Sequence, residues 1–355
     1  MIIVLPLLNL ISMKLCLIHY RKRFLDCFFF IILLGGLLLC YPYFIDGLGD
    51  NKLNSDAIDH IGSFIGGVAT FISIYYLYKT LRSQEKGQEV QFFESRYIEM
   101  VKFNRDILDK ALMAFKEERK CEIGLFESFL EQIENISVIV DKYMPADVRE
   151  LYWDNDNGLN AYNMDYSLYG ERLRERTILN IKYLIVLVGV SSESQYHLLQ
   201  NVYFQHYKTQ IIKDILEQVK LYVGKKFEDP DKKLTALELA RLKKNPDKYF
   251  CGFQKYICSY LRTMYQAVSY VEKKSFLNDS EKYDYVNILR GQLSNEEELV
   301  LFYNSLSVLG QDWEYSLDGA KRKLITKYNM IKNIPDDKYG YLRSFYPGVK
   351  FEYHF

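Results

Sequence analysis

Two apolar stretches near the N-terminus, residues 27–44 and 61–78, dominate the pattern of hydrophobic and polar positions along this chain. Each is long enough to cross the hydrocarbon layer of a bilayer, because a helix needs about 17–25 residues for that. The first stretch carries no charged residue. The second is richer in Gly, Ser and Thr, so a buried helix of a soluble domain stays open as its alternative. We expect a transmembrane hairpin over residues 27–78, joined by an external loop at residues 45–60.

The charges around these stretches predict how the hairpin is oriented. Basic residues precede the first stretch and follow the second: Lys14, Arg21, Lys22, Arg23, and then Lys79, Arg82 and Lys86. The loop between them carries four aspartates against Lys52. By the positive-inside rule, the basic flanks face the cytoplasm. We expect a multi-pass protein of the cell (inner) membrane with both termini cytoplasmic: residues 1–26 form an N-terminal segment and residues 79–355 a cytoplasmic domain.

A pair of small residues in the second stretch indicates close helix packing within the bilayer. Gly62 and Gly66 form a GxxxG pattern, which lets two helix backbones approach each other in lipid. The partner helix is either the other span of the same hairpin or the hairpin of a second copy. The sequence leaves both open.

Beyond the hairpin, apolar residues recur every three or four positions, which predicts an all-α domain. Expected helices cover residues 89–116, 125–143, 207–223, 256–273, 279–293, 295–310 and 317–334. The first of these follows the second span so closely that one helix can contain both. The apolar run 178–190 fits a helix or a strand, and its flank favours a central core helix. Residues 154–166, rich in Asn and Asp, predict a loop.

Helix ends are predicted from capping residues. Asp279 or Ser280 can begin the helix that follows residue 278, and Asn295 with Glu298 three positions later fits a capping box. Gly310 is a suitable residue at which that next helix could stop.

Composition excludes several classes of partner and site. The chain has 46 basic and 46 acidic residues, so no positive excess points to nucleic-acid binding. Its six cysteines form no CxxC pair. We therefore expect neither a metal site nor a cofactor.

Three strings in the second half of the chain begin at Tyr260 (YLRTMY), Ile288 (ILRGQLSNEEEL) and Leu301 (LFYNSLS). They resemble the phage abortive infection proteins of the AbiC-like family, and a weaker likeness to that family lies in FFE and KFNRDI, which begin at Phe92 and Lys102. The resemblance covers about residues 91–334 and is dense over 260–307. Thr263 stands where family members often have His. The resemblance implies antiviral defence in bacterial cells, but no particular chemistry.

The polar residues of these strings are the candidate site, and they allow two interpretations. The candidate residues are Arg262, Tyr265, Arg290, Gln292, Glu298, Tyr303 and Asn304. One interpretation is a structural network of the two arginines with Glu298, Gln292 and Asn304, since charges at the edge of a core are usually paired. The other is a pocket in which two guanidinium groups bind a phosphate or carboxylate.

Tests for enzyme motifs find none, so the catalytic residues are unknown. The chain has no GxxxxGK[ST] loop, HExxH pair or GxSxG elbow, and no histidine follows an arginine at the spacing of helical ribonucleases. We expect a membrane-anchored phage-resistance protein that acts as sensor or effector through protein contacts. Its expected partners are the lipid bilayer, a second copy through the hairpin, and a phage or host protein. A hydrolase or nuclease with an unrecognised site, and a membrane scaffold outside defence, are the alternatives.

Overall fold

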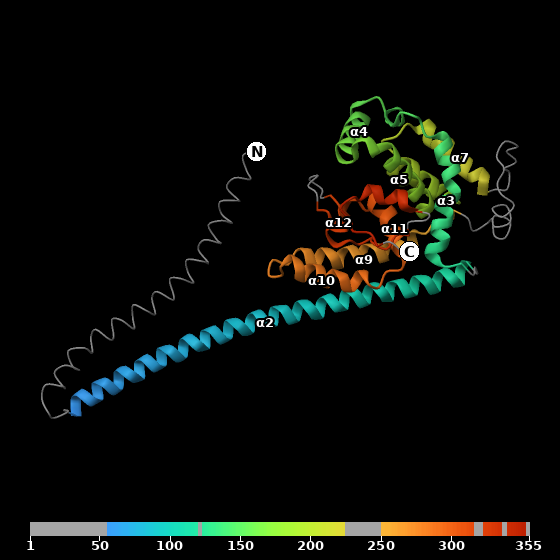
Figure 1. Cartoon of the computed structure of the whole chain (residues 1–355). Helices are drawn as coiled ribbons and strands as arrows, with labels where there is room; N and C mark the ends of the chain where they lie inside the picture. The colour runs from blue at the N-terminus through green and yellow to red at the C-terminus, as the bar shows by residue number, and fades with distance from the viewer. Residues whose placement is uncertain (1–54, 120–122, 224–249, 316–321, 336–338, 353–355) are drawn as a thin grey trace. The chain divides into compact units, whose positions relative to one another are not determined.

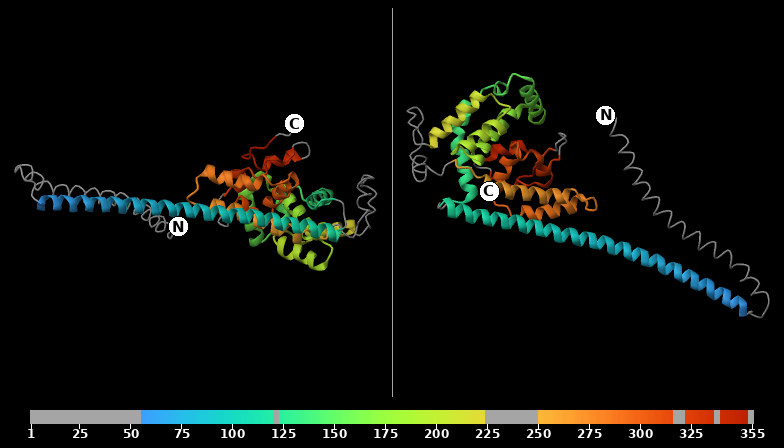
Figure 2. Two further views of the ribbon diagram at one scale, coloured as in Figure 1. Left: turned by 90° about the horizontal axis from the view of Figure 1, so that it is seen from below. Right: turned by 180° about the vertical axis from the view of Figure 1, so that it is seen from behind.

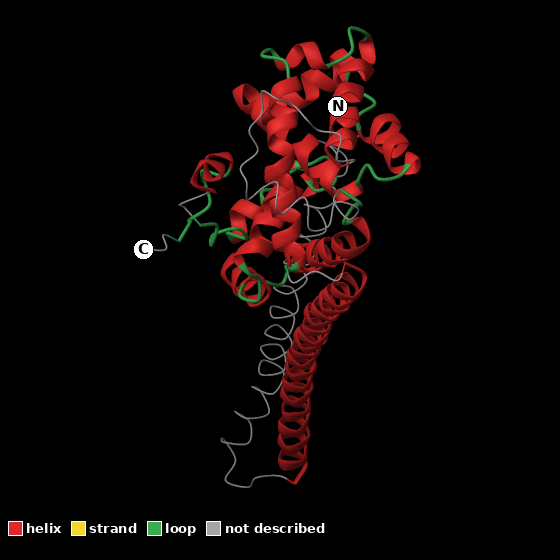
Figure 3. Cartoon of the chain, turned by 90° about the vertical axis from the view of Figure 1, so that its right-hand side faces the viewer, coloured by secondary structure: helices red, strands yellow, loops and turns green. Residues whose placement is uncertain are grey.

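A computed structural model describes residues 55–119, 123–223, 250–315, 322–335 and 339–352, and these residues are helical with connecting loops (Figure 3). Within these ranges no strand occurs, and an isolated antiparallel bridge joins Tyr152 to Tyr207. The predicted all-α class is confirmed. The first apolar stretch, residues 27–44, and the adjoining residues 45–54 lie outside the described residues.

The chain divides into two units, Met1–Phe93 and Glu94–Phe355. Helix α2, Ser55–Arg119, contains both the second apolar stretch and the expected helix 89–116, which confirms that one helix holds the two. Among the described helices, none is both long enough and apolar enough to cross a membrane. In the first unit, however, large apolar side chains of α2 are exposed all around the helix between Ile65 and Leu81.

The second unit is a bundle built around one buried helix, α5 (Figures 1 and 2). Its helices are α3 Leu125–Tyr143, α4 Asp156–Tyr169, α5 Leu173–Val188, α6 Glu193–Leu198, α7 Thr209–Val223, α9 Gln254–Glu272, α10 Asp279–Arg290, α11 Asn295–Leu306 and α12 Leu324–Tyr328. Helices α3, α4 and α11 pack against α5, and α10 packs against α9. Every residue of α5 from Arg176 to Val188 is buried, so the predicted core helix is confirmed and the strand alternative is wrong.

Three polar side chains on α5 bind the C-terminal end of α11. Arg176 Nε donates to the Leu306 carbonyl at 2.8 Å, and Asn180 Oδ1 accepts from the Val308 amide at 3.1 Å. The Tyr183 hydroxyl accepts from Asn304 Nδ2 at 2.9 Å. These α5 residues are spaced by four and three positions, so they share one helix face. They satisfy groups at a helix end that would otherwise be buried without partners.

Two glycines bring the end of α5 against the start of α9. Gly189 and Gly252 both have positive φ, at 88° and 89°, which favours glycine. A Cβ on Gly252 would lie 2.3 Å from the Val188 carbonyl oxygen. Backbone hydrogen bonds from Val190 to Phe250 (2.8 Å) and from Phe253 to Leu187 (2.7 Å) close this crossing.

The loop predicted for residues 154–166 is wrong, because most of it forms α4. Its turn-forming residues cap the helix instead: Asn155 Oδ1 accepts from the Gly158 amide at 2.9 Å. Polar contacts then hold α4 to the bundle. Asp165 accepts from the Tyr152 hydroxyl at 2.8 Å, and the Tyr169 ring lies 4.5 Å from the Arg176 guanidinium carbon.

Several predicted helix ends also need correction. Asn278, rather than Asp279 or Ser280, caps α10 in a capping box with Glu281. Ser294 caps α11 by accepting from the Glu297 amide, so Glu298 takes no part in a capping box.

The last two helices are shorter than expected. Helix α11 ends at Leu306, before Gly310. The helix expected over residues 317–334 is described only as α12, whose end at Asn329 is set by a left-handed backbone conformation. Residues 316–321 lie outside the described residues.

We predict that Arg176→Ala lowers the free energy of unfolding by about 3–5 kcal/mol, because removing one partner leaves buried polar groups uncompensated. Arg176 is fully buried and its Nη1 lies 3.7 Å from the Asp165 carboxylate. Chemical denaturation of the purified chain measures the change. Arg96→Ala, at an exposed arginine paired only with Glu99, is the control and should change stability by no more than about 0.5 kcal/mol. Equal stability of the two variants would contradict the prediction.

Candidate functional site

The candidate residues separate into two places in the second unit. Arg262, Tyr265 and Asn304 line a pocket of about 410 Å³, which we call the Arg262 pocket. Its lining residues are Tyr203, Gln254, Cys258, Leu261, Arg262, Tyr265, Gln266, Asn304, Leu309, Gly310, Asp312 and Trp313. Arg290 instead contacts Tyr328 at the end of α12, and Glu298 contacts Asn333, which follows α12.

Arg262 is exposed where it lines the pocket. It lies on α9, one turn after Cys258, on the face that lines the pocket. Its guanidinium group makes no hydrogen bond or ion pair with any residue that the structure describes. An acidic residue, Asp312, also lines the pocket but forms no ion pair with Arg262 there. The positive charge is therefore available to a ligand.

Aromatic side chains form one wall of the pocket. The rings of Tyr265 and Trp313 meet edge to face, with centroids 5.3 Å apart. The Tyr265 hydroxyl accepts a hydrogen bond of 2.7 Å from Nη1 of Arg322, which brings a second guanidinium group close to the wall. Trp313 is almost fully buried, so its ring is held in place by packing.

The position of Asn304 in the wall follows from the α5–α11 contact. Its Nδ2 donates to the Tyr183 hydroxyl, and the chain then turns back so that Gly310 lies against Asn304. A Cβ on Gly310 would come within 2.2 Å of the Asn304 carbonyl oxygen, so only glycine fits here without a shift. Tyr183 and Gly310 together fix where the Asn304 amide meets the pocket.

The described lining of the pocket has groups that can bind a ligand but no recognisable catalytic set. Burial raises the pKa of the Cys258 thiol to about 11, so it stays protonated at neutral pH and is a poor nucleophile. The lining residues include no histidine that could act as a base. Among the described residues, no cluster of His, Cys, Asp and Glu side chains could hold a metal ion.

Arg290 is fully engaged within the fold. It is buried and donates from Nη1 to the Tyr328 carbonyl at 2.8 Å and to the Tyr283 hydroxyl at 3.0 Å. Its Nη2 donates to Asn287 Oδ1. No hydrogen bond or ion pair in the described part of the chain joins Arg262, Arg290 and Glu298, so neither interpretation holds as stated. Arg262, Arg290 and Glu298 do not form one network, and the Arg262 pocket is lined by Arg262 but not by Arg290.

Glu298 is a buried carboxyl group with a raised pKa. Its two oxygens accept from the backbone amide of Asn333 at 2.7 Å and from its Nδ2 at 2.8 Å. Burial raises the pKa of Glu298 from 4.5 to about 7, and the hydrogen bonds from Asn333 oppose that rise. The two remaining candidates lie elsewhere: Gln292 is exposed, and Tyr303 is buried.

Glu297, next to the candidate Glu298, pairs with an arginine, and sequence reasoning missed this residue. Arg105 Nη1 lies 3.1 Å from Glu297 Oε1, and the Tyr260 hydroxyl donates to Glu297 Oε2 at 2.7 Å. Asn104 donates to the Tyr260 carbonyl at 2.8 Å and to Thr263 Oγ1 at 2.6 Å. The sequence feature that could have pointed to this contact is the string KFNRDI of α2, which contains Asn104 and Arg105.

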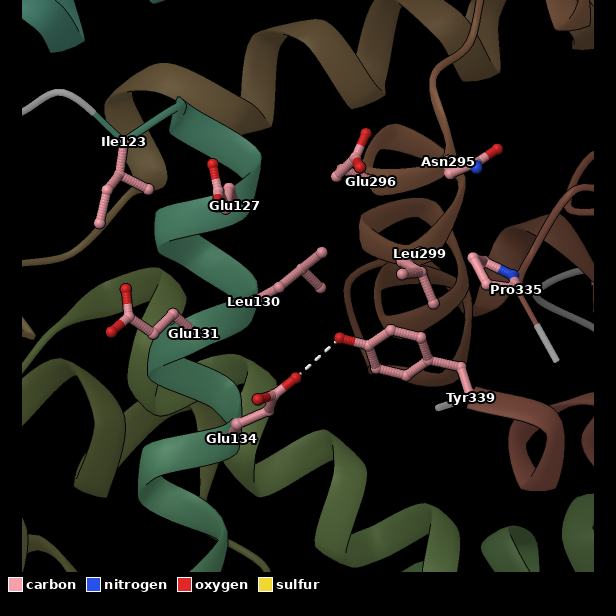
Figure 4. Close-up of a pocket in the computed structure, with 10 residues that line it drawn as sticks. All are labelled: Ile123, Glu127, Leu130, Glu131, Glu134, Asn295, Glu296, Leu299, Pro335 and Tyr339. Carbon is pink, nitrogen blue, oxygen red and sulfur yellow. Dashed lines mark hydrogen bonds between the residues drawn. The ribbon is translucent and has the colours of Figure 1, made fainter. Parts of the chain in front are cut away.

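A second pocket, of about 340 Å³, lies between α3 and α11 and is acidic (Figure 4). Glu127, Glu131, Glu134 and Glu296 line it, and the Tyr339 hydroxyl donates to Glu134 Oε1 at 2.7 Å. It contains none of the candidate residues.

Comparison with known proteins supports the resemblance over the part of the chain that holds both groups of candidates. Residues 252–339 match the model of a family described as "Putative phage abortive infection protein". The match includes all seven candidate residues and every lining residue of the Arg262 pocket except Tyr203. No curated protein and no solved structure is significantly similar to the chain.

We predict that Glu298 makes the stability of the chain depend on pH. The folded state keeps its proton up to about pH 7, whereas the unfolded chain releases it near pH 4.5. The stabilisation is therefore complete below pH 4.5 and is lost as pH rises to about 7. Relative to Glu298→Gln, the native chain should lose up to about 3 kcal/mol over this range.

Denaturation of both proteins at several pH values measures this difference. The control is Glu296→Gln, at an exposed carboxyl two positions away on α11. A native-minus-Glu298→Gln difference that stays constant from pH 4.5 to 7 would show that the carboxyl is not buried as described.

Proposed function

We propose that the chain is a phage-defence protein of the abortive-infection type, anchored in the cell membrane by an N-terminal hairpin and acting from the cytoplasmic face. In this proposal it is a sensor or effector that works through protein contacts. The observation that carries the defence role is the family match over residues 252–339. That segment contains α9 to α12, and it supplies Arg290 and every lining residue of the Arg262 pocket except Tyr203.

The exposed apolar surface of α2 supports membrane anchoring. Phe71, Ile72, Ile74, Tyr76 and Leu77 have 44–62% of their surface exposed and point in different directions around the helix. A helix that is apolar all round needs lipid or protein around it, since a water-facing helix has a polar side. Basic residues follow immediately, which fits a membrane exit on the cytoplasmic side.

Action through contacts, with no bond cleavage, is supported by the chemistry of the Arg262 pocket. Its thiol is protonated, and among the described residues its lining has no histidine and Arg262 has no carboxylate partner. Such a site can bind a ligand, and the bound ligand can change how the domain interacts with a partner protein. The partners we propose are the bilayer, a second copy of the chain, and a phage or host protein.

The first prediction concerns topology. In a chain whose six native cysteines are replaced, Asn54→Cys should react with a membrane-impermeant maleimide in intact spheroplasts, because the hairpin loop faces outward. Lys232→Cys is the paired control and should react only after the membrane is permeabilised. Labelling of Lys232→Cys in intact spheroplasts would refute this orientation.

The second prediction concerns defence. Cells that express the full chain should resist phage, and Gly62→Ile with Gly66→Ile should weaken that resistance by blocking close helix approach. The control is Ser63→Ile with Gly67→Ile, which adds similar bulk one position further along the same helix and so on a different face. All four positions are exposed on α2.

Phage plating, with chain abundance in the membrane fraction measured in parallel, compares the two double variants. Equal resistance of both variants would contradict a role for the Gly62 and Gly66 face. Failure of the native chain to protect against every phage tested would contradict the defence role.

A further inference from the structure

We propose that the Arg262 pocket binds a small anion that carries a flat ring, of the class of nucleoside monophosphates. The inference concerns binding by the purified chain, and it goes beyond the proposed function without depending on it. It rests on the charge, the wall and the size of the pocket.

The positive charge of Arg262 favours a ligand that carries an anionic group. Arg262 lies in the lining with no ion-pair partner among the described residues, although arginine is well suited to bidentate binding of phosphate. Arg322, bound to the Tyr265 hydroxyl at 2.7 Å, adds a second positive charge behind the wall. Arg290 cannot contribute, because it is buried and donates to Tyr283 and Asn287 of α10 and to the Tyr328 carbonyl of α12.

The wall suits a flat ring with polar edges. Tyr203 and Tyr265 are half-buried where they line the pocket, and aromatic side chains are the platforms on which nucleobases stack. The buried Trp313 packs against the Tyr265 ring and supports it. Asn304 and Gln266 place amide groups there, which can both donate to and accept from a ring edge. The carboxylate of Asp312 can accept from a hydroxyl or an amino group of the same ligand.

The size of the pocket favours a small molecule over a polymer. Its volume of about 410 Å³ falls in the range of small-molecule sites, roughly 300–1,000 Å³. A nearly fully buried Trp313 and the glycine-dependent turn at Gly310 give it a fixed shape. A preformed pocket costs a ligand less ordering on binding.

Tryptophan fluorescence tests the proposal directly. The chain has two tryptophans, Trp153 and Trp313, so Trp153→Phe leaves the pocket residue as the sole tryptophan. We expect AMP to change the emission of the full chain saturably, and adenosine, which lacks the phosphate, to bind about tenfold more weakly or worse. No saturable change with AMP, GMP, CMP or UMP, or equal binding of AMP and adenosine, would overturn the proposal.

Two charge variants locate the binding. In the Trp153→Phe background, Arg262→Ala should weaken AMP binding by about tenfold or more, and Gln266→Glu should weaken it through repulsion of the phosphate. Both positions are exposed, so folding should be retained, and a circular dichroism melt checks it.

The matched controls are Arg96→Ala and Gln292→Glu, at exposed residues outside the pocket. Both should bind AMP as the parent does. AMP binding that survives both pocket variants unchanged would place the ligand elsewhere and refute the assignment.

Discussion

The second unit depends on how α5 holds the end of α11. Arg176, Asn180 and Tyr183 lie on one face of a helix that is otherwise packed in apolar surroundings, and each binds a group of α11 or of the turn after it. Burying these polar groups is costly unless they are hydrogen-bonded, and a buried guanidinium is costlier still. The contact therefore selects one position for α11 and disfavours others.

The shape of the Arg262 pocket depends on this contact between α5 and the end of α11. One wall comes from α9, whose start is fixed against the end of α5 at the Gly189–Gly252 crossing. Another part of the lining includes Asn304, which Tyr183 of α5 binds, and Gly310, which lies against Asn304. A single buried helix thus helps to position both parts of the lining. Arg262 can point into it unpaired, because its exposure spares the cost that a buried lone charge would carry.

The sequence predicted helices well and their mutual contacts poorly. The range 125–143 coincides with α3, and the buried run 178–190 proved to be the core helix, because apolar periodicity and length report directly on one element. The sequence could not show that Arg290 binds a backbone carbonyl near Asn329, or that Glu297 and not Glu298 pairs with an arginine. Those outcomes depend on which helix faces meet, and neighbouring glutamates look alike in a sequence. Helix α4 was missed because its Asn, Asp and Gly residues are typical of loops. In the structure Asn155 caps the helix, and tertiary contacts outweigh the weak helix propensity of its sequence.

Hydrogen exchange at the Val308 amide tests most directly whether α5 holds the end of α11. This amide donates to Asn180 Oδ1, so Asn180→Leu, which keeps the branching at Cγ and the number of side-chain heavy atoms, removes its acceptor. The Asn333 amide, which donates to Glu298, serves as the internal reference. The account predicts that Val308 exchanges about tenfold faster or more in the variant while Asn333 is unchanged. Equal protection of Val308 in both proteins would contradict it.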